Sequence, residues 1–185
     1  MSRRTRLFVA GMPHHVLQRG NNKNRIFFSP GDYKFFLEVL YEAKLKHPCR
    51  IYSYCLMTNH FHLLVVPEKE ENISLLMKLL GAKYVRYINK AYGRTGTLWE
   101  GRFKCSLLQE ELYFLSCIRY IEMNPLKAGM VNSPELYRWS SFRFRGFGEK
   151  DRILDLDPWY NSIGEHPKER QLEYRRFFRT KLPKQ

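Results

Sequence analysis

The sequence predicts a domain of the α+β class, in which strands and helices alternate and a C-terminal appendage follows the core. Two observations predict this class. Several segments repeat their apolar residues with the period of a helix, and β-rich runs lie between them. Two of those runs are separated by a short turn at Thr58-Asn59, as in a β-hairpin. The resulting order is β, α, β, β, α, β, α, and the length of 185 residues favours one domain.

The N-terminal half predicts a strand, a helix and a hairpin. Residues 13–19 form a short mixed run that ends at a Gly-Asn-Asn turn signal, which is typical of a strand followed by a loop. From Asp32, interpreted as an N-cap, apolar residues recur with a helical period until Pro48 stops them. The runs 51–57 and 61–66 are β-rich, so they predict two central strands.

The C-terminal half begins with the clearest helix of the sequence. Residues 73–88 place their apolar side chains at i, i+3, i+4 and i+7. Residues 102–108 then predict a strand, and residues 110–124 predict a helix that Pro125 stops.

The chain is expected to divide into two parts. Residues 1–145 form the principal domain, and residues 146–185 form a basic C-terminal tail with a short helix over 168–179. The longest apolar run, Leu63 to Val66, cannot span a bilayer, and no signal-peptide core follows the first residues. The four cysteines form no C-x-x-C pair, which disfavours a zinc finger and a disulfide framework. We therefore expect a cytoplasmic protein with no membrane partner.

The net charge of +14 is unevenly distributed along the chain. No acidic residue precedes Asp32, and seven basic residues between Lys78 and Lys104 meet one acidic residue. The segment from Lys168 to Lys184 holds seven basic residues against two acidic ones. A run of charge is usually a solvated face. Three clusters of one sign, interleaved with aromatic residues that make up 15% of the chain, suit phosphate neutralisation and base stacking, so we expect a nucleic-acid partner.

A candidate metal site lies where the strand 61–66 begins, at His60 and His62. Side chains alternate along a strand, so both imidazoles share one face and a single cation could meet both rings. The strand is apolar on both faces, which predicts histidines that are partly buried and need partners. Two structural histidines would give the same pattern, so the pair alone leaves both interpretations open.

The helix predicted over 110–124 supplies a second set of polar groups. At about 100° per residue, Tyr113, Tyr120 and Asn124 form a narrow strip nearly opposite the apolar face. A phenol and an amide oxygen one turn apart therefore project together away from the core. A solvent-facing tyrosine and an asparagine that ends a helix before proline would give the same pattern. The expected apolar face consists of Leu112, Leu115, Ile118 and Ile121.

Together, the histidines and this strip could break and rejoin a phosphodiester. Two imidazoles and an amide oxygen can hold a divalent cation with open positions, which polarises the phosphodiester as a Lewis acid. A tyrosine phenoxide can attack phosphorus and keep the strand covalently attached. Such chemistry conserves bond energy, which strand transfer needs and simple hydrolysis does not.

Five segments between about Gly11 and Phe144 carry a family resemblance. They are Pro13-His14-His15-Val16 with Gln18-Arg19-Gly20-Asn21, Tyr54 to Val65 with Thr58-Asn59-His60-Phe61-His62 inside it, Leu98 to Phe103, Arg119 to Gly129, and Trp139-Ser140-Ser141. In these segments the chain resembles the Y1 HUH-type transposases of the IS200 class, and the Asn-Pro after the tyrosine is most similar to the REP-associated tyrosine transposases. Thr58 departs from the family's frequent proline at that turn, which should leave the histidine face intact.

The resemblance implies a ferredoxin-like antiparallel sheet with helices packed on it and the histidines on a central strand. It implies that His60, His62 and Asn124 bind Mg²⁺ or Mn²⁺. It also implies that Tyr120 is the catalytic nucleophile, which forms a 5′-phosphotyrosine link and frees a 3′-hydroxyl. Tyr113 falls outside the family motif, so we expect it to pack or to touch DNA.

The partner that the resemblance implies is single-stranded DNA folded into imperfect hairpins from palindromic repeats. The protein would be a monomer or a homodimer. Each candidate for DNA contact could also be ordinary surface or core, Trp99 in particular. On charge, stacking capacity and position, the candidates are Arg19, Lys83, Arg86, Lys90, Trp99 and Arg102.

Two other functions fit parts of the sequence. A domesticated transposase that binds hairpin DNA without cutting it would keep the basic clusters, although the intact set of site residues argues against it. A metal phosphohydrolase of small nucleotides could use the histidine pair without a tyrosine, but no carboxylate neighbours His60 or His62. We therefore expect a DNA transposase that acts as a metal-dependent single-strand DNA endonuclease and strand transferase.

Overall fold

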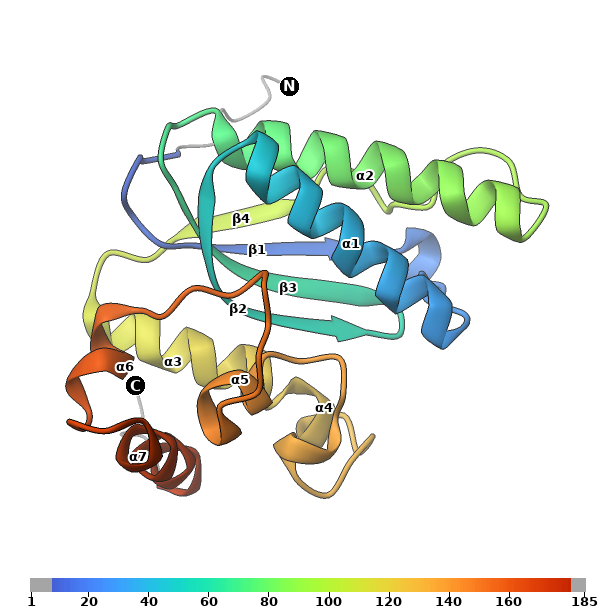
Figure 1. The fold of residues 1–185 in the computed structure, drawn as a ribbon. Helices are drawn as coiled ribbons and strands as arrows, with labels where there is room; N and C mark the ends of the chain where they lie inside the picture. Colours follow the sequence, from blue (N-terminus) through green and yellow to red (C-terminus); the bar gives the residue numbers. More distant parts are fainter. Residues whose placement is uncertain (1–7, 181–185) are drawn as a thin grey trace.

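The computed structural model describes residues 8–180, and its centre is a four-stranded antiparallel sheet (Figure 1). The strand order is β2-β3-β1-β4, and every neighbouring pair runs antiparallel. The predicted hairpin is confirmed, because β2 and β3 pair along their length and only Thr58 and Asn59 join them. The strands are β1 (His14–Arg19), β2 (Cys49–Met57), β3 (His60–Pro67) and β4 (Lys104–Leu107).

Two helices cover one face of the sheet. In Figure 1, α1 (Pro30–Lys46) and α2 (Asn72–Ala91) lie side by side above the strands. Their inward residues, such as Phe36, Leu80 and Tyr84, form one core with Phe61 and Leu63 of β3. The chain order β1-α1-β2-β3-α2-β4 with this strand order is the ferredoxin-like arrangement, so the predicted fold class is confirmed.

The start of α1 differs from the prediction. Ser29 is the N-cap, whereas Asp32, which was expected in that role, occupies the third helical position. The Asp32 carboxylate accepts hydrogen bonds from the backbone N–H of Phe28 (2.7 Å) and of Ser29 (2.8 Å), as in a capping box. It also accepts a hydrogen bond from Tyr87 of α2 (3.0 Å), so one buried carboxylate both caps α1 and ties it to α2.

The opposite face of the sheet is covered by α3 (Glu111–Glu122) and the elements that follow it (Figure 1). Of the apolar face predicted for this helix, Ile118 and Ile121 are fully buried, but Leu112 is 48% exposed. The prediction for Leu112 was wrong because the stripe that meets the sheet runs through Phe114 and Cys117 instead. The later elements are α4 (Asn124–Lys127), α5 (Phe142–Phe147), α6 (Pro158–Ser162) and α7 (Pro167–Arg179), with 3₁₀ turns η1 (Asn21–Lys23) and η2 (Pro134–Leu136).

Pro125 does not act as the predicted stop of a helix that reaches Asn124. The helix α3 already ends at Glu122, and Asn124 with Pro125 begins the short helix α4. Proline is tolerated in the first turn of a helix because the N–H groups there have no partner within the helix. Only Met123 therefore separates α3 from α4.

The segment expected as an appendage packs closely against α3. The predicted final helix is confirmed as α7, and its residues Tyr174 and Phe178 are buried in one core with Phe114 and Ile118. The division after residue 145 stays a prediction, but the described part of the C-terminal segment shares a core with the sheet. In the part of the chain that the structure describes, no helix is long and apolar enough to cross a membrane.

Candidate active site

Two neighbouring strands bring polar side chains to the face of the sheet that α3 covers. β1 and β3 pair so that Arg19 lies opposite His60 and Leu17 lies opposite His62. The ring centroids of His60 and His62 are 5.0 Å apart, as the alternation of side chains requires. The same alternation puts His15 on this face, diagonally across from His62. Three imidazoles and one guanidinium therefore gather at this face.

Asn59, which precedes β3, determines which nitrogen of His60 carries the proton. The Nδ2 of Asn59 donates to the backbone carbonyl of Lys23 (2.9 Å), so its Oδ1 lies on the other side, 2.6 Å from Nδ1 of His60. An amide oxygen only accepts hydrogen bonds, so Nδ1 of His60 is the protonated nitrogen. The Nε2 of His60 then has a free lone pair, which is the form that binds a metal ion.

His62 is buried and has one nitrogen without a partner. Its side chain is 2% exposed, and its Nδ1 lies 2.8 Å from Nε2 of His15, with the two rings stacked. The Nε2 of His62 is buried and meets no hydrogen-bond partner among the described residues. Burial, followed by the nearby charges of His15, His60 and Arg19, lowers the pKa of His62 to about 3, so the imidazole is neutral at pH 7. A neutral imidazole with an unused buried nitrogen is typical of a metal ligand.

Tyr120 reaches these histidines from α3. Its ring meets the rings of His62 and His15 edge-on, with centroids 5.5 Å and 5.9 Å away. The side chain is 44% exposed, so a DNA strand could approach it from solvent. Tyr113, two turns earlier on the same helix, is 46% exposed, which agrees with the predicted outward strip. The structure brings Tyr120 to the histidines.

Asn124 begins α4, and the end of α3 orients its amide. Its Nδ2 donates to the backbone carbonyl of Tyr120 (2.7 Å), which leaves Oδ1 as the unused atom of the amide. Two imidazole nitrogens and an amide oxygen suit a divalent cation that keeps open coordination positions. Over residues 8–180, no group of three His, Cys, Asp or Glu side chains offers another metal site. His60 and His62 therefore fit a metal ion at this face, and Asn124 stays the predicted third ligand.

The sequence prediction missed two residues of this site. His15 contacts both His62 and Tyr120, but only the pairing of β1 with β3 reveals this contact. Lys127 places its Nζ 5.3 Å from the ring centroid of Tyr120. The spacing of seven residues between Tyr120 and Lys127 is typical of one helix face, but Pro125 predicts the end of the helix before Lys127.

Arg19 is the DNA-contact candidate that the fold places beside the histidines. It lies opposite His60. The pKa of His60 is lowered mainly by burial and, to a smaller extent, by the positive charge of Arg19. The predicted basic stripe of α2 lies beyond the other face of the sheet, and Lys83 is paired there with Glu42 of α1 (2.6 Å). That stripe consists of Lys83, Arg86 and Lys90.

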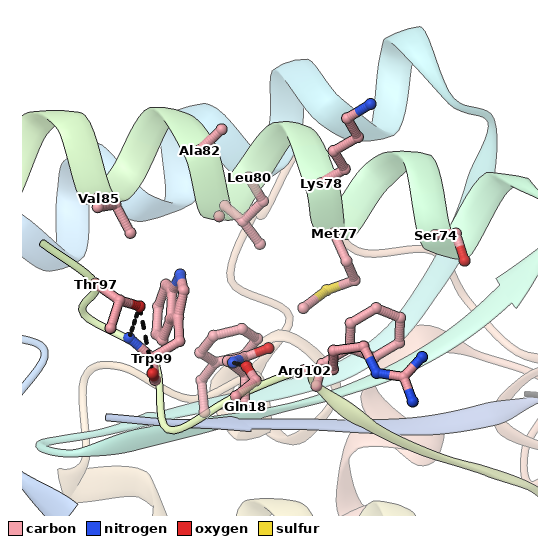
Figure 2. A pocket seen from close by; sticks show the side chains of 14 residues that line it. Gln18, Ser74, Met77, Lys78, Leu80, Ala82, Val85, Thr97, Trp99 and Arg102 are labelled. Atoms are coloured by element: carbon pink, nitrogen blue, oxygen red, sulfur yellow. Dashed lines mark hydrogen bonds between the residues drawn. The ribbon is translucent and has the colours of Figure 1, made fainter. Parts of the chain in front are cut away.

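Trp99 and Arg102 lie on the loop between α2 and β4. The ring of Trp99 contacts Phe61 and Tyr84, with centroids 5.9 Å and 6.1 Å away, so Trp99 packs partly into the core. Arg102 is exposed. Both residues line a cavity with residues of α2 (Figure 2), and Arg102 also lines a second cavity with Arg19.

The chain matches a known protein family over most of its length. Residues 8–124 match the family model described as "Transposase IS200 like". The chain belongs to the IS200-like transposase family. The matched range contains His60, His62, Tyr120 and Asn124, and it ends before the C-terminal helices. As a member of a transposase family, the chain is a DNA-processing enzyme.

This IS200-like transposase is similar to REP-associated members of the family. It is 25% identical over 122 residues to a Haemophilus influenzae protein named "Putative REP-associated tyrosine transposase", across 60% of this chain and 69% of that protein. A solved structure of a REP-associated tyrosine transposase bound to a REP hairpin matches with a TM-score of 0.67 and 20% identity, over 90% of this chain and 98% of the other. At this identity the structural match shows the shared fold, and it extends beyond the range of the family model.

Proposed function

We propose that this transposase is a metal-dependent single-strand DNA endonuclease and strand transferase that acts on hairpin DNA through a 5′-phosphotyrosine intermediate. The observation that carries the proposal is the edge-on contact of Tyr120 with His62, whose Nε2 is buried and unpartnered. A phenol beside a nitrogen that is available to a cation suits attack on a phosphodiester.

Tyr120 is the nucleophile in this proposal. Its hydroxyl loses a proton and its oxygen bonds to phosphorus, while the bond from phosphorus to O3′ breaks and the leaving oxygen gains a proton as a 3′-hydroxyl. The new link conserves the energy of the phosphodiester, so a 3′-hydroxyl of another strand can reverse the step and join the DNA. Lys127, with Nζ 5.3 Å from the ring centroid, stabilises the negative charge that develops.

His60, His62 and Asn124 are the proposed ligands of Mg²⁺ or Mn²⁺. The bound ion would supply Lewis-acid polarisation of the scissile phosphate. The protein keeps the three donor atoms in the required state. Asn59 sets the tautomer of His60, His15 contacts Nδ1 of His62, and the end of α3 orients the amide of Asn124.

Hairpin DNA is the proposed substrate. Support comes from the similar fold of a REP-associated transposase whose structure contains a REP hairpin, and from the net charge of +14. Arg19 is placed to hold the backbone beside the histidines. Because its substrate is DNA, we propose that the enzyme works in the cytoplasm.

The test is formation of a covalent adduct with an end-labelled hairpin from the gene's own flanks. We expect an adduct in gel electrophoresis with Mg²⁺ or Mn²⁺, its loss with EDTA, and its loss in Tyr120→Phe. Tyr113→Phe is the matched control, because this tyrosine is equally exposed on the same helix and should leave the adduct unchanged. An adduct that persists in Tyr120→Phe overturns the assignment of the nucleophile. Binding without cleavage by the unmodified protein indicates a non-catalytic hairpin-binding protein instead.

A further inference from the structure

A cavity of about 470 Å³ lies at the end of the sheet where β3 ends and α3 begins. In Figure 1 this end of the sheet is on the left, where α6 lies beside the start of α3. Val66, which lines the cavity, comes six residues after His60, or about 20 Å along the strand. The cavity is therefore separate from the candidate active site, although both lie on the face of the sheet that α3 covers.

Aromatic side chains form much of the wall of this cavity. Tyr52, Phe114 and Trp159 line it, and the rings of Tyr52 and Phe114 meet edge-on with centroids 5.8 Å apart. Met12 and Leu108 add further apolar surface. The faces of aromatic rings carry partial negative charge, so such a wall attracts cations as well as apolar groups.

A β-bulge turns Tyr52 toward the cavity. The pairing of β2 with β3 shifts between Ile51 and Ser53, so Tyr52 is the extra residue of β2 and its side chain packs on the α3 face. The side chain is 4% exposed, and its hydroxyl meets no hydrogen-bond partner among the described residues. Buried polar groups normally have a partner, so this hydroxyl is available to a ligand in the cavity.

Two exposed carboxylates also line the cavity. Glu110 and Glu111, at the start of α3, form no ion pair among the described residues. The basic residue of the described lining is Arg50, whose guanidinium carbon is 5.9 Å from the ring centroid of Tyr52. Two negative charges exceed this positive charge and the partial charge of about +0.5 at the start of a helix. The opening of the cavity is therefore negative, on a chain whose net charge is +14.

We propose that this cavity binds an arginine or lysine side chain of a partner protein. The charged head group lies against the aromatic rings and the two carboxylates, and the apolar stem packs on the apolar part of the wall. The Tyr52 hydroxyl accepts a hydrogen bond from the head group. DNA is disfavoured because carboxylates repel phosphates. A polyamine carries charges along its whole length, whereas Glu110 and Glu111 lie together at one side of an apolar cavity, so a single charge on an apolar stem fits better.

The test measures binding of three blocked tripeptides to the full chain: Gly-Arg-Gly, Gly-citrulline-Gly and Gly-Glu-Gly. Binding is followed by NMR at the indole N–H of Trp159, which Trp159→Phe identifies among the three tryptophans of the chain. We expect the arginine peptide to shift this signal and to bind about tenfold more tightly than the neutral citrulline peptide. Glu110→Gln/Glu111→Gln should remove this difference, and Tyr52→Phe should weaken arginine binding by about threefold.

Glu70→Gln/Glu71→Gln is the matched control. It makes the same change of charge at two adjacent exposed residues, which follow the end of β3 and do not line the cavity. It should leave the preference for arginine over citrulline unchanged. Unchanged amide signals away from the cavity show that each variant is folded.

Four outcomes overturn the inference. They are equal binding of the arginine and citrulline peptides, tighter binding of the glutamate peptide through Arg50, an equal loss of arginine binding in the control variant, and tighter binding of spermidine than of the arginine peptide. The last outcome would make the ligand a free polyamine. The inference does not depend on the proposed catalysis, because adduct formation by Tyr120 is a separate measurement and a failure of either proposal leaves the other intact.

Discussion

The hydroxyl of Tyr174 stabilises the buried carboxylate of Glu122, the last residue of α3. Glu122 is 0% exposed, and its Oε2 accepts a hydrogen bond from this hydroxyl at 2.7 Å. The other oxygen, Oε1, accepts hydrogen bonds from Ser141 (2.5 Å) and Ser53 (3.3 Å). Tyr174→Phe keeps the ring and its packing on Phe178, and it removes only the donor to Oε2.

The size of the effect follows from the burial of this hydrogen bond. A hydrogen bond to a charged group contributes about 1.5–3 kcal/mol, and a buried carboxylate that loses its donor cannot turn to water. In a domain of this size, 1 kcal/mol shifts Tm by about 2–4 °C, so Tyr174→Phe should lower Tm by roughly 3–12 °C. Urea unfolding should show a lower midpoint with an unchanged m-value.

The pH dependence of this loss has a definite sign. Burial raises the pKa of Glu122, and the hydrogen bonds from Ser141 and Tyr174 act against this shift. The folded state therefore binds this proton more tightly than the unfolded state, and stability falls as pH rises from the ordinary carboxyl pKa through the raised one. Tyr174→Phe raises the pKa further. The loss of unfolding free energy in Tyr174→Phe should be largest above the raised pKa of Glu122. It should shrink as the pH falls below that pKa, because a protonated carboxyl depends less on a hydrogen bond from the Tyr174 hydroxyl.

Tyr113→Phe is the control, because it removes a hydroxyl from a side chain that is 46% exposed. Its stability should stay within about 0.5 kcal/mol of the unmodified protein. The reasoning is refuted if Tyr174→Phe is as stable as this control at every pH above the raised pKa of Glu122. It is also refuted if Tyr174→Phe loses the same stability at pH values below and above the raised pKa of Glu122.

Three further predictions concern single contacts. Asn59→Ala frees the tautomer of His60 and should weaken Mn²⁺ binding by about 10–100-fold in calorimetry, and an unchanged affinity would contradict the role of Asn59. Lys127→Met should slow adduct formation by Tyr120 about tenfold or more at unchanged hairpin affinity, whereas an equal loss of binding would make Lys127 a simple DNA contact. Asp157→Ala leaves the fully buried Arg145 unpaired and should cost about 3–5 kcal/mol in urea unfolding. The double variant Arg145→Met/Asp157→Leu should recover most of that loss, and an equally unstable double variant would show that the ion pair is not the cause.

The elements that the sequence predicted correctly are those with a local cause. Periodicity gave the helices α1 and α2 within a few residues, and the two-residue turn at Thr58 and Asn59 gave the hairpin. The shared face of His60 and His62 follows from the geometry of any strand. The N-cap at Ser29 was missed, because an aspartate three residues later is an equally good local signal.

What the sequence did not predict depends on contacts between distant segments. The position of His15 beside His62 depends on the register of β1 against β3, which no local pattern specifies. The helix α7 was predicted, but its docking was not, because its partner α3 lies more than forty residues earlier in the chain. The buried carboxylate of Glu122 was also unforeseen, since its donors come from separate elements, Ser53 of β2 and Tyr174 of α7.

The C-terminal helix α7 is hydrogen-bonded to the part of α3 that carries Tyr120. Residues two apart on a helix point about 200° apart, so Tyr120 faces the histidines while Glu122 faces the core. Glu122 is bonded to Tyr174, and on the other side of Tyr120 the guanidinium of Arg119 donates to the backbone carbonyl of Phe178 (2.9 Å). Apolar packing alone would let a helix slide along a sheet, whereas these hydrogen bonds are directional and fix its position. The placement of Tyr120 against β3 therefore depends on α7, which lies outside the range that the family model matches.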